Sequence, residues 1–159
     1  MAKIKIHNLI YTRGQALLHI QMHESKMTYL PPILSTFRAE GIFIPLIIQT
    51  FFQKQLVTLN LILDQKDLPL GRVAFQEGLD LTPPEFLKIK KNILLITFYG
   101  PHLDEYPGVV SRLGHSLSGE GVEILAVSAS LNSCLLVVPE LFFLKTQQAL
   151  ERICDIPRA

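Results

Sequence analysis

The chain has 159 residues, of which 48% are hydrophobic and 18% charged, and its formal net charge is +1. That length suits one ordinary domain or two small ones, and so apolar a chain must bury a large core or a large subunit interface. The near-neutral charge argues against a general attraction to nucleic acid or anionic lipid, and the apolar content argues against intrinsic disorder.

The first half of the sequence alternates strand-like and helix-like patterns. Period-two or continuous apolar runs predict strands, and apolar residues three or four apart predict amphipathic helices. The run over 86–90 alternates apolar residues with lysine, which predicts one buried and one solvent-facing side. In chain order the predicted elements are a strand over 3–11, a strand over 17–22, a helix over 29–40, strands over 46–52 and 56–63, a helix over 67–76 and the strand over 86–90.

The second half repeats this order. Its predicted elements are a strand over 93–98, a helix over 108–120, strands over 125–130 and 133–138, and a helix over 141–154. In the last helix we expect one apolar face, although its spacing is loose. The residues predicted to form it are Leu141, Leu144, Gln148 and Ile153.

Aligning Gly41 with Gly121 superimposes the two copies. Both glycines directly follow a predicted helix, where a left-handed residue closes the last turn without a Cβ penalty. The alignment also matches the apolar stripe of one helix with that of the other. The matched residues, four apart in each copy, are Ile33 with Leu113 and Phe37 with Leu117.

The second copy reaches the C-terminus before a fourth strand appears, whereas the strand over 3–11 has no place in the first copy. We therefore expect this strand to complete the second copy. The order strand–helix–strand–strand–helix–strand with a four-stranded antiparallel sheet is the ferredoxin-like plan. The predicted class is α+β, with two small tandem domains over 12–91 and 92–159, the latter completed by residues 3–11.

Several motifs of the second copy follow one another in a recognisable order. They are Ile-Leu-Leu-Ile at 93–96, Tyr-Pro-Gly-Val-Val at 106–110, Gly-Val-Glu-Ile at 121–124, Val-Ser-Ala-Ser at 127–130 and Gln-Gln-Ala-Leu at 147–150. In this order they resemble the last ACT domain of aspartate kinases, and Tyr-Thr-Arg-Gly-Gln-Ala at 11–16 resembles the segment that leads into the first. The resemblance implies tandem ACT domains like the C-terminal regulatory region, or a regulatory subunit, of aspartate kinase.

Nothing in the chain resembles the kinase half of those enzymes. The sequence contains no GxGxxG or Walker phosphate loop, and no nucleophile-elbow pattern surrounds the serines near His115. His19 and His23 form the only close histidine pair, and no carboxylate or cysteine joins them at metal-ligand spacing. We therefore expect no enzymatic activity, no cofactor and no metal site.

Compartment and redox state follow from the apolar runs and the cysteines. No apolar run reaches the roughly 18 residues that span a bilayer, and the N-terminal residues lack the apolar core of a signal peptide. Cys134 and Cys154 stand apart from any metal-like pattern, so we predict buried thiols. The expected location is the cytoplasm.

A turn between a strand and a helix exposes backbone N–H groups that favour a carboxylate, and the chain has two such turns. In the first ACT domain, aspartate kinases usually have Asp-x-Pro-Gly at this turn. The matching residues here are Ser25, Lys26, Met27 and Thr28. The change removes a carboxylate that would pair with an amine and crowds the backbone approach, while Lys26 favours a more acidic ligand.

The resemblance also implies ligand contacts outside this turn. Gln49 matches the glutamine that contacts the effector in aspartate kinases, and Glu123 and Ile124 occupy the facing positions supplied by the second ACT domain. Glu123 would restore the missing negative charge. Structural alternatives remain open: Gln49 as a satisfied amide, Glu123 as an exposed strand residue, and residues 25–28 as a solvated, capped turn.

The second turn, over 100–108, keeps the Pro-Gly signature and is the better preserved of the two. Its candidate ligand-binding residues are His102, Asp104, Pro107, Gly108 and Val109. Proline and glycine also suit the start of a helix for purely structural reasons.

The expected function is a regulatory module that binds an amino acid, with lysine or threonine as first candidates, at domain or subunit interfaces. It would convey that binding to an aspartate-kinase-type or other metabolic enzyme. The alternative is a scaffolding ACT pair whose pockets have degenerated and which serves assembly alone. We expect a homodimer, because apolar edge strands such as 125–130 invite pairing with another chain.

Overall fold

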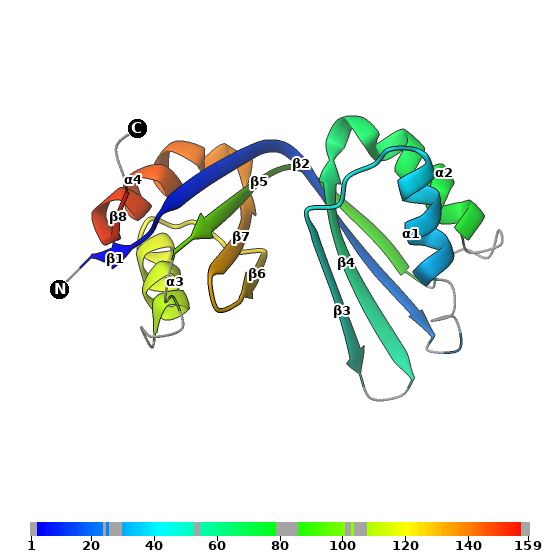
Figure 1. Cartoon of the computed structure of the whole chain (residues 1–159), viewed down its shortest axis with the longest axis horizontal. Coiled ribbons are helices and arrows are strands. Elements are labelled where there is room, and N and C mark those ends of the chain that lie inside the picture. Colours follow the sequence, from blue (N-terminus) through cyan, green and yellow to red (C-terminus); the bar gives the residue numbers. More distant parts are fainter. Residues whose placement is uncertain are drawn as a thin grey trace. The chain divides into compact units, whose positions relative to one another are not determined.

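The computed structural model describes residues 3–23, 25, 30–52, 55–78, 86–100, 103 and 108–156. Within them the chain is an α+β fold with one six-stranded sheet of order β3-β4-β2-β5-β7-β6 and a two-stranded sheet of β1 and β8 (Figure 1). The strands are β1 (Ile4–Lys5), β2 (Asn8–His23), β3 (Leu46–Phe52), β4 (Leu56–Asp64), β5 (Phe86–Tyr99), β6 (Ala126–Ala129), β7 (Ser133–Pro139) and β8 (Cys154–Asp155). The helices are α1 (Leu30–Ala39), α2 (Leu68–Gly78), α3 (Val109–Gly119) and α4 (Phe143–Ile153), with short 3-10 turns η2 (Gln65–Asp67) and η4 (Glu140–Phe142).

The chain divides into two compact units. The middle unit is Gly14–Lys91, and the terminal unit joins Met1–Arg13 with Asn92–Ala159. Strands β2 and β5 each run through both units. At both crossings the backbone is left-handed, with φ of 66° at Gly14 and 56° at Asn92, residue types that tolerate this region.

In the middle unit the elements follow the order β2, α1, β3, β4, α2 and β5, and the strands lie in the order β3-β4-β2-β5. The register sets Leu18 opposite Leu61 and Ile20 opposite Leu59. These side chains line one sheet face, and Phe37 of α1 packs with them in the same core. Helices α1 and α2 lie side by side (Figure 1).

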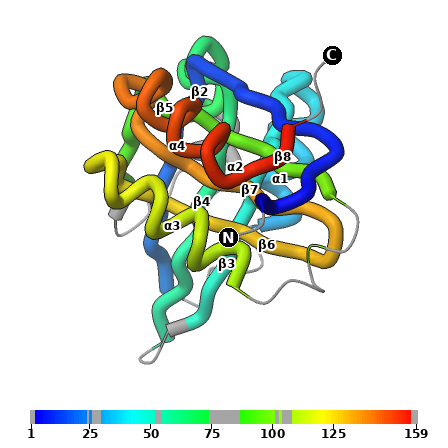
Figure 2. The backbone as a smooth tube through the Cα atoms, turned by 90° about the vertical axis from the view of Figure 1, so that its left-hand side faces the viewer, coloured from blue at the N-terminus to red at the C-terminus, as the bar shows by residue number. Residues whose placement is uncertain are grey.

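In the terminal unit β5, α3, β6, β7 and α4 follow one another, and β1 and the first residues of β2 join from the N-terminus. The core lies between α3, α4 and the sheet face that carries Leu94, Ile96 and Phe98. β1 pairs in parallel with β8, so that Ile4 lies opposite Cys154 and the two ends of the described chain run together (Figure 2). This small sheet was not predicted.

The predicted helix C-termini are confirmed in both copies. Gly41 and Gly121 have φ of 68° and 72°. The amide of Ile42 donates to the carbonyl of Phe37 at 2.8 Å, and the amide of Val122 donates to that of Leu117 at 3.0 Å. The glycine amides donate to Arg38 and Ser118, which completes the same Schellman cap twice.

The predicted face of the last helix is wrong. Leu141 and Leu144 are 78% and 68% exposed, and Gln148 is exposed too. The α-helix begins only at Phe143, after the 3-10 turn, and Phe142 and Phe143 pack against the core. These aromatic rings set the rotation of the helix, so that its buried side chains are Thr146, Ala149 and Leu150, with Ile153 partly buried.

Two boundaries also differ from the prediction. The strand over 3–11 is divided into β1 and the start of β2, which continues without a break through residues 17–22. The predicted strands over 86–90 and 93–98 are one strand, β5, with the left-handed Asn92 inside it. Among the described residues, no helix is long and apolar enough to cross a membrane.

Candidate ligand-binding site

Gln49 lies on β3, at one end of the strand order. It pairs with Leu59, which in turn pairs with Ile20, and both of these belong to the core under α1 and α2. Because directly paired residues project to the same side of a sheet, the Gln49 side chain points to the helix-covered side. It is half-buried there, and within the described part of the chain its amide has no hydrogen-bond partner. The amide can therefore both accept and donate a hydrogen bond at this edge.

Ser25 follows the end of β2 and is exposed. Its backbone amide and hydroxyl both lie within hydrogen-bond distance of His23 Nδ1, at 3.3 and 2.9 Å. Since the amide can only donate, Nδ1 is the acceptor of that contact. Phe52 at the end of β3 and His23 at the end of β2 both pair with Leu56 of β4. Gln49 lies three residues before Phe52 on β3. Gln49 therefore lies about 10 Å along the strands from the level of His23, and Ser25 follows His23 by two residues.

Gly108 begins α3 in the left-handed region, with φ 88° and ψ 11°, and as a glycine it has no side chain with which to cap the helix. Its carbonyl accepts the first helical hydrogen bond from Arg112 at 2.9 Å. The first N–H groups of an α-helix have no partner within the helix and carry the positive end of its dipole. A Cβ added at Gly108 would meet nothing within 4 Å among the described atoms. The start of α3 can therefore receive a carboxylate.

Val109, Glu123 and Ile124 lie at the two ends of α3. Val109 is buried in the terminal core, and Ile124 is partly buried against it. Glu123 is exposed between α3 and β6. An eleven-residue helix is about 16 Å long, so within the terminal unit Glu123 and Ile124 are remote from Gly108.

Six predicted site residues lie outside the described residues: Lys26, Met27, Thr28, His102, Asp104 and Pro107. Leu103, which lies between His102 and Asp104 in the sequence, is described and is buried in the terminal core. A Cβ at Gly100 would lie 3.1 Å from both Leu103 Cδ2 and the Lys5 carbonyl oxygen. Among the described residues of the second turn, Leu103 therefore packs into the core, a role that the sequence analysis did not predict.

The cysteines are free and buried, as predicted. Burial raises the pKa of Cys134 to about 11 and that of Cys154 to about 11. Both thiols are protonated near neutral pH and are poor nucleophiles. His19 Nδ1 lies 2.8 Å from Asn60 Oδ1, and among the described residues no three His, Cys, Asp or Glu side chains group as metal ligands.

No protein-family model and no curated protein sequence matches the chain. By structure, the ligand-free regulatory subunit of aspartate kinase from Thermus thermophilus matches with a TM-score of 0.82 at 13% identity, covering 94% of this chain and 99% of that one. Clostridium acetobutylicum aspartate kinase matches with a TM-score of 0.80 at 17% identity over 95% of this chain and 35% of that one.

E. coli aspartokinase III in complex with lysine and aspartate matches with a TM-score of 0.64 at 17% identity, covering 94% of this chain and 33% of that one. At these identities the likeness shows the fold alone. The predicted resemblance to the regulatory region of aspartate kinase is therefore confirmed as a resemblance of structure.

Proposed function

We propose that this chain is a non-catalytic regulatory module that binds an amino-acid effector and conveys its presence to an aspartate kinase or another enzyme of amino-acid metabolism. The observation that carries the proposal is the match to a regulatory subunit over 94% of this chain and 99% of the subunit. Lysine and threonine are the first candidates, and lysine is bound by E. coli aspartokinase III, which shares the fold. We expect the module to work in the cytoplasm.

We further propose that both units are ACT-type, ferredoxin-like domains, with the N-terminal strand completing the domain formed by residues 92–159. The order of elements supports this in the middle unit, where strand, helix, strand, strand, helix and strand follow one another. In the terminal unit the same order holds once β2 is counted last, after α4. The sheet order supports it as well, because β3-β4-β2-β5 and β6-β7-β5-β2 run through equivalent strands.

Recognition of an amino acid needs partners for a carboxylate and for an amine. The N-terminus of α3, beginning at Gly108, suits the carboxylate because backbone N–H groups and the positive end of the helix dipole lie there. Gln49 supports a second contact in the middle unit, where its amide oxygen can accept from an ammonium group. The effector stabilises the conformation of the protein that binds it more tightly. The difference in affinity between conformations is then the regulatory signal.

The second candidate function is assembly alone. It is favoured by the first turn, where Ser25, Lys26, Met27 and Thr28 replace the usual Asp-x-Pro-Gly of aspartate kinases. A protein of this kind would keep the fold and the subunit contacts but bind no amino acid.

In either case we expect a homodimer. Strands β3 and β6 lie at the two ends of the sheet order. Their side chains include Ile47 and Phe51, 41% and 61% exposed, and Val127, 41% exposed. Exposed apolar edges favour pairing with a second chain. Light scattering at micromolar concentration tests this, and a monomer would contradict it.

The decisive experiment is a thermal-shift screen of the full chain against the twenty amino acids. A ligand at 100 times its Kd stabilises by about 2.7 kcal/mol, or roughly 5–10 °C for a protein of this size. We expect such a shift from one amino acid, and its loss in Gly108→Trp or Gln49→Ala. Gly119→Trp, at the far exposed end of α3, and Gln148→Ala, exposed on α4, are the matched controls.

The outcomes separate the two functions. A shift that survives in both controls and is lost in Gly108→Trp or Gln49→Ala supports amino-acid sensing and identifies the turn that binds. If no amino acid shifts the melting temperature of a folded dimer, sensing is wrong and assembly remains. Equal loss in the controls would mean that the ligand binds elsewhere.

A further inference from the structure

The first residues of the described chain join two parts of the terminal unit that lie far apart in the sequence. We call residues 3–7 the N-terminal strap. Its strand β1 pairs in parallel with β8, and the amide of Ile6 donates to the carbonyl of Asp155 at 3.4 Å. The amide of His7 donates to the carbonyl of Tyr99, the last residue of β5, at 2.6 Å. One short segment is therefore hydrogen-bonded both to the last described strand and to the residue that precedes the second turn.

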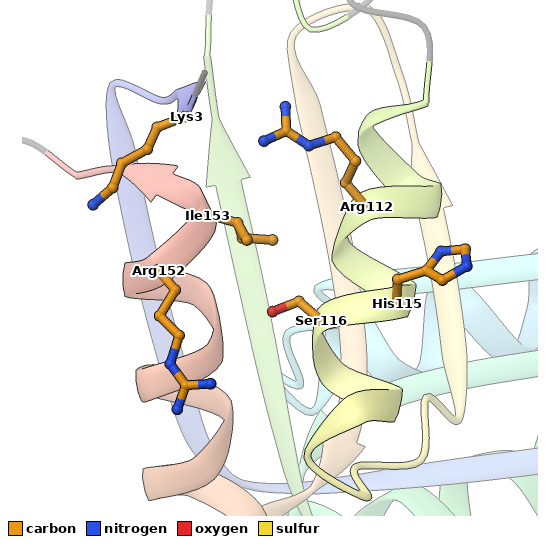
Figure 3. A pocket seen from close by; sticks show the side chains of 6 residues that line it. All are labelled: Lys3, Arg112, His115, Ser116, Arg152 and Ile153. Atoms are coloured by element: carbon orange, nitrogen blue, oxygen red, sulfur yellow. The ribbon is translucent and has the colours of Figure 1, made fainter. Parts of the chain in front are cut away.

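One cation and two apolar side chains hold the strap. Lys3 Nζ donates to the carbonyl of Glu151 at 2.9 Å, where the negative end of the α4 dipole favours a cation. Figure 3 shows Lys3 beside this end of α4, where it lines a pocket together with residues of α3 and α4. Ile4 and Ile6 are 4% and 3% exposed and belong to the terminal core. Since β1 and β8 have only two residues each, burial of these isoleucines is the main force that holds the strap in place.

Gly100 lies where the strap meets the second turn. Its φ is outside the left-handed region, so the backbone conformation alone does not call for a glycine. The reason is steric, because an added Cβ would lie 3.1 Å from the carbonyl oxygen of Lys5 in the strap and 3.1 Å from Leu103 Cδ2 in the turn. Both distances are shorter than an ordinary van der Waals contact. The backbone of the strap and the side chain of Leu103 therefore both pack directly on Gly100.

The same contacts fix the start of the second turn. Tyr99 accepts the hydrogen bond from the strap, and the amide of the next residue, Gly100, donates to the carbonyl of Asn132 between β6 and β7 at 3.1 Å. Leu103 lies in the same buried cluster as the two isoleucines of the strap, and so does Val109 at the start of α3. Opening of the strap would remove from this region one hydrogen bond, one backbone contact and two core side chains at once. Groups that share their supports in this way open together.

We propose that the N-terminal strap and the start of the second turn, at Gly100 and Leu103, open and close as one unit, and that the strap thereby reports whether the turn is occupied. The coupling rests on the contacts between the strap and these two residues. Its regulatory role rests on the proposed function, in which the start of α3, at the end of the same turn, receives the carboxylate of the effector. Because linkage is reciprocal, an effector that fixes the turn holds the strap closed, and anything that draws the strap away weakens effector binding by the same factor.

Native-state hydrogen exchange, measured by NMR on the full chain without effector, tests the coupling. In rising urea below the unfolding transition, the His7 and Gly100 amides should exchange with the same free energy of opening and the same urea dependence, because they belong to one cooperative unit. Ile6→Ala in the strap should speed exchange at Gly100 about tenfold or more, since truncation of a buried isoleucine weakens the closed state by at least that factor. Gly100→Ala should speed exchange at His7, because the added methyl group displaces the Lys5 carbonyl.

Two matched controls separate coupling from a general loss of stability. Leu117→Ala removes a fully buried side chain from the same core at the far end of α3. Gly114→Ala adds a methyl group on α3 where no described atom lies within 4 Å. Neither control should change exchange at His7 or Gly100. Far-UV circular dichroism establishes that each variant is folded.

Two results would overturn the coupling. If Ile6→Ala speeds exchange at His7 but not at Gly100, the strap opens alone. If Leu117→Ala speeds exchange at both amides as much as Ile6→Ala does, the effect is a general loss of stability. The regulatory role has its own test, because the amino acid found in the thermal-shift screen should slow exchange at His7, and one that binds without slowing it would overturn that role. If the screen finds no amino acid, the regulatory role falls with the proposed function while the coupling, measured without effector, stands.

Discussion

Two glycines of the terminal unit should respond to the same substitution with opposite signs. Gly121 follows α3 with φ of 72°, whereas Gly114 lies inside α3 and has no positive φ. At both positions an added Cβ would meet no described atom within 4 Å. Backbone conformation, and not crowding, therefore decides what an alanine does to the free energy of unfolding.

The magnitudes follow from that difference. Alanine at position 121 must adopt the left-handed region, which destabilises the folded state by about 1–2 kcal/mol. Alanine also lowers the conformational entropy of the unfolded chain, which offsets about 0.4–1 kcal/mol of that loss. Gly121→Ala should therefore destabilise by about 1 kcal/mol. Gly114→Ala pays no conformational cost and should stabilise by about 0.5–1 kcal/mol. The two variants should differ by about 1.5–2 kcal/mol.

Urea unfolding followed by circular dichroism measures these differences. If the chain melts in one transition, 1 kcal/mol moves the melting temperature by about 2–4 °C, and if a single unit melts alone, by about 4–8 °C. Gly41→Ala in the middle unit, with φ of 68°, should repeat the loss seen at Gly121. A Gly121→Ala protein as stable as the parent would refute the left-handed cap, and a destabilised Gly114→Ala would refute the backbone argument.

Two further predictions concern the terminal core. Leu150→Ala should lower the free energy of unfolding by about 2–5 kcal/mol, whereas Leu144→Ala should change it by less than about 0.5 kcal/mol. Urea unfolding measures both values. Similar losses in the two variants would show that α4 buries the face predicted from the sequence. Stability should also fall as pH rises from 9 toward 11, because unfolded thiols titrate near 9.0 while Cys134 and Cys154 keep their protons until about 11. Urea unfolding at pH 8 and pH 10 measures this loss of stability, and Cys134→Ala should make the loss smaller. A free energy of unfolding that is equal or higher at pH 10 would contradict the prediction.

The repeat and most elements could be predicted because their signals are local. Helix stripes such as Ile33 with Phe37 reflect a four-residue spacing, and Gly41 marks a helix end by its own conformational preference. The strand over 46–52 was predicted with its observed bounds, since its β-prone residues lie between Pro45 and the polar run at 53–55. Such features need no knowledge of what lies across the sheet.

The features that could not be predicted depend on residues far apart in the chain. The face of α4 is set by the packing of Phe142 and Phe143 against a core built by other segments. The pairing of Ile4 with Cys154 joins the two ends of the described chain, and no local pattern encodes it. The candidate-site residues Gln49 and Gly108 were identified by their match to a family pattern and not by a local physical signal.

The two copies share their helix C-termini but differ at the helix N-termini, and this bears on which turn binds an effector. The alignment that matches Gly41 with Gly121 sets Thr28 against Gly108. Gly108 starts α3 with φ of 88°, a conformation in which a β-branched threonine is strongly disfavoured. A threonine cannot readily reproduce the open backbone approach that the glycine provides at α3. A carboxylate should therefore bind chiefly at α3, and Gly108→Trp should remove more of the amino-acid-induced thermal shift than Gln49→Ala. The reverse ranking would place the effector at the first turn despite its altered sequence.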